Sequence, residues 1–389
     1  MAQPKRPSIL LPFVIVAACV VGLRLLPSTA GAAQQQDPLA EPFRGVTTNG
    51  TIQSGLFAIR KTGVSTEPVM KAAEKFLATL TEEQKSKTAY PVDDTEWRRW
   101  NNVHRAVRQG VSFKEMTDAQ RTVAWEFLKS ALSAKGLEQS RNIMRLNGYV
   151  GEVLNNPAEY GEDMYHLTVM GVPSKTEPWG WQLEGHHLIV NYFVLGDQVV
   201  MTPTFMGSEP VTVTEGKWAA SVLQAEQNKG LAFYRSLTDV QRTRATISAT
   251  KTANNAQSQA FRDNLVLEYA GMRANSLNNE QRKAFLDLIG EYIANMPPGH
   301  AKVRMAEVEA KLDDTYFAWV GAADSAAVFY YRIHSPVVLI EFDHQTPVAF
   351  RGQGGRGPTR QHIHTVVRTP NGNDYGKDLL RLHLEQHKH

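Results

Sequence analysis

Met116-Thr117-Asp118-Ala119-Gln120-Arg121 occurs in four related forms along the chain, and this recurring pattern determines the fold class that we expect. Each copy has Leu or Met, then Thr or Asn, then Gln three residues later. This is a capping box, in which Thr or Asn caps a helix and Gln reaches back to the amide of the cap. The other copies are Leu80-Thr81-Glu82-Glu83-Gln84-Lys85, Leu237-Thr238-Asp239-Val240-Gln241-Arg242 and Leu277-Asn278-Asn279-Glu280-Gln281-Arg282. A helix is predicted to begin at each of them.

The four boxes form two pairs, and each pair is followed at a similar spacing by a run typical of a β-strand. These runs are residues 182–191 and 332–341. The repetition predicts an α+β fold of two duplicated halves, residues 66–225 and 226–389, after an N-terminal extension at 34–65. Each half would be a helical segment followed by antiparallel strands, with the halves related by a pseudo-two-fold axis. Chance similarity between helix caps is the alternative.

Residues 1–33 have the pattern of a secretory signal peptide. Lys5 and Arg6 precede an apolar run from Ser8 to Leu23, and small residues follow up to Ala33. An uncleaved membrane anchor is the alternative, but a span needs about 20 apolar residues and Arg24 interrupts the run. We therefore expect a secreted or periplasmic protein with no stable membrane insertion after cleavage.

Composition excludes several kinds of site and partner. The single cysteine, Cys19, lies in the predicted signal peptide, so the mature chain has neither a disulfide nor a thiolate ligand. The whole chain has 42 basic and 39 acidic residues. Cleavage removes Lys5, Arg6 and Arg24 and no acidic residue, so the mature chain has equal numbers of basic and acidic residues. This balance gives no support to a nucleic-acid partner.

His362-Ile363-His364 is the strongest candidate for chemistry. Histidines two residues apart on a strand point to the same side, which suits two metal ligands. Glu341 ends an apolar run, where a carboxylate needs a partner or a cation. We predict one divalent metal ion, held by His187, Glu341, His362 and His364; zinc is favoured, and manganese, iron or copper are alternatives. Structural packing of the histidines at a strand end remains the other interpretation.

The run at 182–191 adds polar groups whose faces depend on strand geometry. Alternation places Glu184 with His186 on one side and His187 with Asn191 on the other, unless a bulge at Gly185 changes the register. In the register of the duplication, Asn191 corresponds to Glu341 and Glu184 to His334. Glu184 and His334 are predicted as alternate ligands or as a catalytic acid/base pair.

Five residues are candidates for substrate binding. Arg368 has the chemistry of a clamp for a carboxylate or phosphate. Asp374 either assists it or caps a helix beginning near Tyr375. Trp179 and Trp181, with Asn191 nearby in sequence, are candidates for lining a cleft. A salt bridge for Arg368 and Asp374, and core packing for the tryptophans, are the alternatives.

Several segments together resemble a large family of exported, mostly bacterial proteins filed as domain of unknown function 3500. The resemblance covers most of residues 66–386 and implies export and a two-part layout. The segments are residues 178–191, Pro203-Thr204-Phe205-Met206-Gly207, Tyr331-Arg332-Ile333-His334, Ile340-Glu341 and residues 362–376. The family has no settled activity, so the resemblance implies no mechanism.

The chain also lacks the short motifs of nucleophile elbows, phosphate-binding loops, dinucleotide folds and His-Glu-x-x-His metalloproteases. The leading prediction is an exported metal-dependent enzyme, with hydrolysis favoured over oxidoreduction and a small molecule or polymer as substrate. One alternative is a non-catalytic periplasmic or cell-surface binding protein with a tryptophan-lined cleft. Another is metal-free acid/base catalysis by Glu184 and His334.

Overall fold

A computed structural model describes residues 1–2, 39–352 and 356–387. Cys19 and nearly all of the predicted signal peptide lie outside these residues. Every helix and strand of the described residues belongs to the compact unit Pro38–His389, which combines helices with a large mixed sheet and so confirms the α+β class.

The first half of this unit contains four α-helices and nine strands among the described residues. The helices are α1 (Glu67–Thr79), α2 (Glu82–Thr88), α3 (Asp118–Ala131) and α4 (Ala134–Val153), with a 3-10 turn at Thr95–Arg98. The strands are β1 (Ala89–Tyr90), β2 (Val111–Ser112), β3 (His166–Met170), β4 (Trp179–Gly185), β5 (Leu188–Leu195), β6 (Gln198–Val200), β7 (Thr204–Ser208), β8 (Thr212–Val213) and β9 (Ala220–Ser221).

The second half continues with similar elements. The helices are α5 (Gln224–Ser236), α6 (Asp239–Ala245), α7 (Asn279–Ile293), α8 (Pro298–Glu309) and α9 (Lys377–Gln386). The strands are β10 (Thr246–Ser248), β11 (Met272–Arg273), β12 (Tyr316–Gly321), β13 (Phe329–His334), β14 (Leu339–His344) and β15 (Ile363–Arg368). Short 3-10 turns lie at Ala274–Ser276, Leu312–Asp314 and Asp374–Gly376.

One sheet joins the two halves. Its main path runs β1-β3-β4-β5-β7-β15-β14-β13-β12-β10, so β7 and β15 are its central pair. The pairings are antiparallel except at the two ends, where β1–β3 and β10–β12 are parallel. Strands from both halves therefore meet along β7 and β15, which places residues near 205 beside residues near 365.

All four predicted capping boxes are present. Thr81, Thr117, Thr238 and Asn278 begin α2, α3, α6 and α7, and each exchanges both bonds of the motif with its glutamine. The glutamines also bond in pairs, Gln120 Nε2 to Gln84 Oε1 at 2.7 Å and Gln281 Nε2 to Gln241 Oε1 at 2.8 Å. Each box thus starts a helix and ties it to the neighbouring helix.

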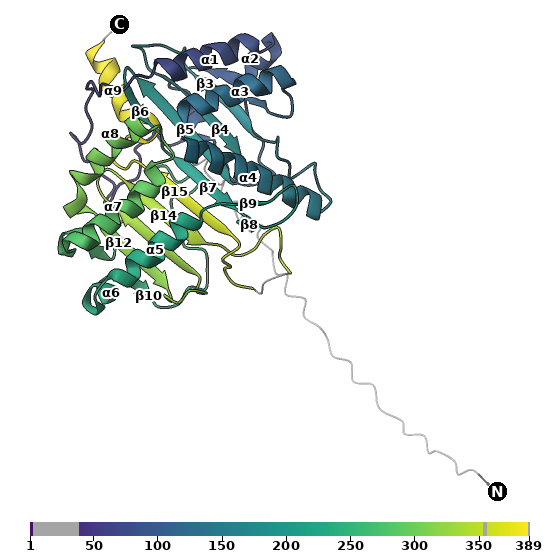
Figure 1. Cartoon of the computed structure of the whole chain (residues 1–389), viewed down its shortest axis with the longest axis vertical. Helices are drawn as coiled ribbons and strands as arrows, with labels where there is room; N and C mark the ends of the chain where they lie inside the picture. Colours follow the sequence, from purple (N-terminus) through teal and green to yellow (C-terminus); the bar gives the residue numbers. More distant parts are fainter. Residues whose placement is uncertain (3–38, 353–355, 388–389) are drawn as a thin grey trace, which may run out of the picture. The chain divides into compact units, whose positions relative to one another are not determined.

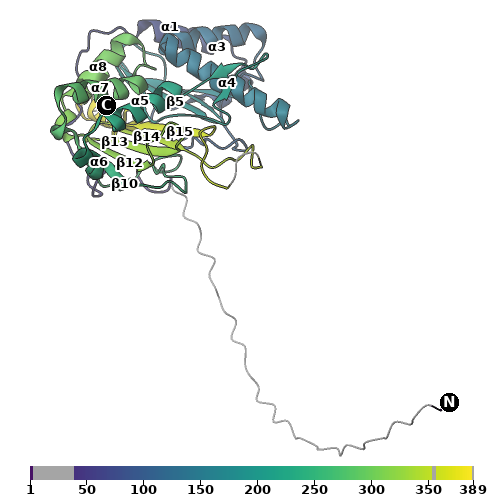
Figure 2. The ribbon, with the colours of Figure 1, turned by 60° about the horizontal axis from the view of Figure 1, so that its bottom comes forward.

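The two faces of the sheet have different cover. Figure 2 shows α1, α3, α4, α5 and α7 on one side of the strands, and the main apolar core lies beneath them. The other side is covered by loops and α9, with a smaller apolar cluster that includes Trp97, Trp100 and Tyr375. Directly paired residues of antiparallel strands point to the same side, so the pairing of Asp343 with His364 places both on this loop-covered side.

Figure 1 shows the central position of β7, β14 and β15. None of the helices in the described ranges is long and apolar enough to cross a membrane.

Candidate metal centre

The central strand pair brings together histidines from distant parts of the chain. His364 lies on β15, opposite Gly207 of β7, and His362 immediately precedes the same strand. The amide of Gly207 donates to the carbonyl of His187 at 2.8 Å. Gly207 therefore links the loop that carries His187 to the strand that carries His364.

His187 reaches this position from a tight turn. The run at 182–191 is a hairpin rather than one strand: β4 and β5 close at the pair Gly185–Leu188, leaving His186 and His187 as the turn. The prediction from strand alternation was therefore wrong at these two histidines. His187 has a φ of 63°, a left-handed conformation that suits a hairpin turn, and its ring stacks on that of His186 with centroids 4.0 Å apart.

The three imidazoles converge through their Nε2 atoms. His187 Nε2 lies 3.2 Å from His362 Nε2 and 3.1 Å from His364 Nε2, and the last two atoms are 3.0 Å apart. All three side chains are buried, and together they form a group of potential metal ligands. The structure thus brings together three of the four predicted ligands.

Hydrogen bonds on the far sides of two rings fix where their protons lie. His362 Nδ1 is 2.8 Å from the carbonyl oxygen of Thr346, and His364 Nδ1 is 3.1 Å from Gln259 Oε1. Each partner is an acceptor, so each Nδ1 carries the proton and each Nε2 presents a lone pair. Two lone pairs 3.0 Å apart repel each other, and a cation between them removes that repulsion.

Burial also keeps the three histidines neutral. It lowers the pKa of His187 and His364 well below the usual 6.5, and neighbouring histidines lower both further. The pKa of His362 is likewise lowered by burial, although Glu209 and the carbonyl of Thr346 act in the opposite direction. Neutral imidazole is the form that binds metal.

Glu209 is the carboxylate beside this cluster. Its Oε2 lies 3.5 Å from His362 Nδ1. Both of its oxygens accept backbone amides from Val348, Ala349 and Phe350. Glu209 therefore fixes residues 348–350 close to His362.

Glu341, the fourth predicted ligand, lies outside this group. Its oxygens accept from the amides of Gln257 and Ser258, the hydroxyl of Ser258 at 2.5 Å and the hydroxyl of Tyr330 at 2.6 Å. The buried carboxylate thus has hydrogen-bond donors as its partners, and most of them come from residues 251–263. We call this segment the strap.

Two other charged residues hold the same strap. Asp343 pairs with Lys251 Nζ at 2.5 Å and accepts the amides of Asn255 and Ala256. Arg368 donates to the carbonyls of Ser258 and Gln259 at 2.7 and 3.0 Å. Glu341, Asp343 and Arg368 therefore fix the backbone from Asn255 to Gln259, and the side chain of Gln259 contacts His364.

Arg368 was predicted to clamp a substrate, and its surroundings argue against that role. Its side chain is fully buried and makes ion pairs with Asp263 at 2.9 Å and Asp374 at 3.0 Å. Burial alone would lower its pKa, but Asp374 and Asp263 raise it overall. Asp374 accepts from the amide of Thr369 and from Arg368, while Gly376 occupies the N-cap of α9. The salt-bridge alternative describes this pair better than substrate binding does.

The predicted tryptophan cleft is not formed. Trp179 and Trp181 are fully buried on the helix-covered side, and Trp181 packs on Phe127 and Tyr192. Asn191 lies on the other side, where it accepts from Gln182 and donates to the carbonyl of Pro203, both at 2.7 Å. These three residues are structural in this arrangement.

Glu184 and His334 are far apart. They lie on β4 and β13, which are separated by five strand-to-strand steps, or about 24 Å at the usual spacing. Glu184 accepts the amide of Asn101 at 2.9 Å and lies beside Arg108, and burial raises its pKa to about 7. The distance excludes a direct acid/base pair.

Four further residues surround the histidines, and the sequence did not indicate their roles at the site. Gln259 and Thr346 orient the rings, Gly207 makes room for them and Glu209 fixes the adjacent segment. Gln259 and Thr346 lie outside the strands and helices, so no periodicity in the sequence indicates their roles.

His334 provides a test of the effect of burial. In the described residues neither of its ring nitrogens has a hydrogen-bond partner, and burial lowers its pKa from 6.5 to about 3. Below pH 6.5 the unfolded chain binds a proton that the folded chain does not bind, so stability falls as the pH falls, down to about pH 3.

We expect the unfolding free energy of wild-type metal-free protein to fall by about 1.6 kcal/mol more between pH 6.5 and 5 than that of a His334→Leu variant. This follows from the two pKa values of His334, because one pKa unit corresponds to about 1.4 kcal/mol and the unfolded histidine is already half protonated at pH 6.5. Urea unfolding of both proteins at several pH values measures this difference. Parallel pH dependences for the two proteins would contradict the assigned environment of His334.

Comparison with known proteins agrees with the resemblance seen in the sequence. Residues 62–377 match the family described as protein of unknown function (DUF3500), which is well over half of the chain. No curated protein and no solved structure matches the chain. The chain therefore belongs to the DUF3500 family.

Proposed function

We propose that this protein is an exported metal-dependent enzyme, with one divalent ion bound by His187, His362 and His364. The observation that carries the proposal is the close approach of three buried Nε2 atoms, two of which have their protons fixed on Nδ1 by Thr346 and Gln259. A proton donated by His187 can relieve only part of this crowding. A metal ion satisfies all three lone pairs together.

The spacing of the nitrogens suits a metal ion. Zinc–imidazole bonds of about 2.0–2.1 Å turn the observed separations into N–metal–N angles of about 90–105°. Such angles place the three ligands on one side of the ion and leave at least one coordination position open. Catalytic zinc sites typically have three protein ligands and one such position.

The charge of the ligands favours activation of water. Three neutral imidazoles leave both positive charges of a divalent ion uncompensated by the protein, and zinc in such a site lowers the pKa of bound water to about 7. Zinc-assisted hydrolysis is therefore the chemistry that we favour, with manganese, iron or copper oxidoreduction as the variant. The substrate class remains a small molecule or a polymer.

Export is proposed from the sequence alone. Lys5 and Arg6, the apolar run that follows and the small residues near Ala33 support a cleaved signal peptide and a secreted or periplasmic location.

We also propose that the two halves are duplicated about a pseudo-two-fold axis. The support is that the strand order reads alike from both ends of the sheet, β1-β3-β4-β5-β7 and β10-β12-β13-β14-β15. The linked pairs of capping boxes recur in the same way. On this proposal the site lies where the halves meet, and it is made of residues that differ between them.

The two rival functions have less support. A binding protein with a tryptophan cleft needs Trp179 and Trp181 to be accessible, and both are fully buried. Metal-free acid/base catalysis needs Glu184 close to His334, and several strands separate them.

Metal content tests the proposal directly. Mature protein, residues 34–389 without a purification tag of histidines, is expected to contain about one metal ion per chain by mass spectrometry, as a single three-histidine site requires. His187→Ala, His362→Ala and His364→Ala should each lose it.

His383→Ala is the matched control, because His383 lies on α9 outside the three-histidine group, and it should keep the metal. Wild-type protein that stays empty after reconstitution with zinc, manganese, iron and copper would overturn the proposal. Retention of metal in all three cluster variants would overturn the ligand assignment.

Gly207 gives a second test that leaves all three ligands in place. A Cβ at this position would lie 3.1 Å from His364 Cδ2, 3.2 Å from His187 Cδ2 and 2.7 Å from the carbonyl oxygen of Ile363. Gly207→Ala should therefore displace the rings and weaken metal affinity by about 10- to 100-fold, as changes around metal ligands typically do.

Gly357→Ala is the control, since a Cβ there meets no atom within 4 Å. Competition with a chromophoric chelator measures both affinities, and thermal unfolding checks that both variants fold. Equal affinity in the two variants would show that the ligand geometry does not depend on Gly207.

A further inference from the structure

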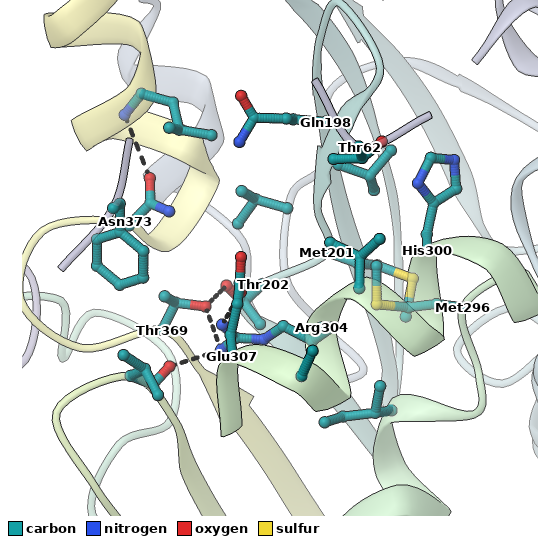
Figure 3. A pocket seen from close by; sticks show the side chains of 18 of the residues that line it. Thr62, Gln198, Met201, Thr202, Met296, His300, Arg304, Glu307, Thr369 and Asn373 are labelled. Atoms are coloured by element: carbon teal, nitrogen blue, oxygen red, sulfur yellow. Dashed lines mark hydrogen bonds and ion pairs between the residues drawn. The ribbon is translucent and has the colours of Figure 1, made fainter. Parts of the chain in front are cut away.

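A separate cavity lies near the other end of β15. It has a volume of about 320 Å³ and is lined by α8, β6, residues 56–62 and the chain that follows β15. Figure 3 shows Met201, Met296, Arg304 and Glu307 around it. Thr369 lines the cavity, and five residues at a rise of about 3.3 Å separate it from His364, a distance of about 16 Å. The cavity is therefore distinct from the histidine cluster.

The interior of the cavity is mainly apolar. Met201, Ile293 and Met296 are buried lining residues, and Val200 and Val303 are partly buried. Its volume is at the lower end of the range of about 300–1,000 Å³ found for small-molecule sites. These properties suit the apolar body of a small ligand better than a sugar or a nucleotide.

The charged residues of the cavity are unbalanced in favour of cations. Arg60, Arg304 and Lys311 line it, and Glu307 is the only acid among the lining residues. Burial lowers the pKa of His300, another lining residue, so that its imidazole adds no charge at pH 7. The four charged side chains thus carry an excess of positive charge.

Glu307 bonds to two of these cations, and its single negative charge offsets only one of their two positive charges. Its Oε1 accepts from Arg60 at 2.8 Å and its Oε2 from Arg304 at 2.9 Å. Arg304 is further held by the carbonyl of Val337 and the hydroxyl of Thr369. Arg60, by contrast, has a half-exposed side chain, so its remaining N–H groups can turn to an anion.

We propose that this cavity binds a small apolar monocarboxylate. Its hydrocarbon body would lie among Met201, Ile293 and Met296, and its carboxylate would take a charge-assisted hydrogen bond from Arg60 at the opening. The proposal is independent of the metal centre, since the two sites share no residue.

Isothermal titration with three probes of one chain length tests this proposal. Decanoate should bind to the full mature protein, decan-1-ol more weakly, and decylammonium not at all, because only the carboxylate complements the excess positive charge. Equal binding of the three probes, or no binding of decanoate, would overturn the proposal.

Amino-acid substitutions test whether decanoate binds in this cavity. Val303→Phe fills the cavity from a partly exposed position of α8 and should weaken decanoate binding at least about tenfold. Arg60→Gln should weaken it roughly two- to fivefold. Lys61→Gln, which removes the same charge from an exposed neighbour outside the lining, should leave it unchanged.

Metal-free protein and the His364→Ala variant are controls for binding of the carboxylate at the histidine cluster instead of in the cavity. Both should bind decanoate as the wild type does. Loss of binding in His364→Ala together with normal binding in Val303→Phe would overturn the cavity assignment.

Discussion

Backbone pairing between β7 and β15 is the contact on which the candidate site depends. It is the only step in the main path of the described sheet where a strand of the first half meets a strand of the second. His364 lies opposite Gly207 in this pairing, and Gly207 in turn holds the carbonyl of His187. A shift of one residue would turn the side chains of β15 to the other side of the sheet. The register of two strands therefore decides whether three histidines from distant segments can share one ion.

Buried charged side chains hold the strap in place beside the histidines. Glu341, Asp343 and Arg368 lie on the loop-covered side of the sheet, where an unpaired charge would be costly. The strap, residues 251–263, meets them with backbone amides, carbonyls and Lys251. The same bonds fix Gln259 behind His364. Residues that resembled ligands or substrate clamps in the sequence thus act one step away from the histidines, by holding the segment that orients one of them.

The sequence predicted correctly those features that depend on residues close together in the chain. Its predictions were less accurate where a side chain contacts residues far away in the sequence. A capping box involves atoms within four residues, and all four predicted boxes formed. His362 and His364 were found by their spacing along one strand. Glu341 was correctly read as a buried carboxylate that needs a partner, but that partner comes from Gln257 and Ser258 in a segment without periodicity. His187 joined the cluster through a hairpin turn that strand alternation did not indicate.

X-ray absorption spectroscopy of the metal-loaded protein tests the central claim most directly, because it reports the atoms bound to the ion itself. The account predicts about three nitrogen neighbours at about 2.0–2.1 Å for zinc, with the outer-shell scattering of imidazole rings. It also predicts that this imidazole signal weakens in His364→Ala. A coordination shell of oxygen atoms alone, or an identical spectrum from wild type and His364→Ala, would contradict the three-histidine centre.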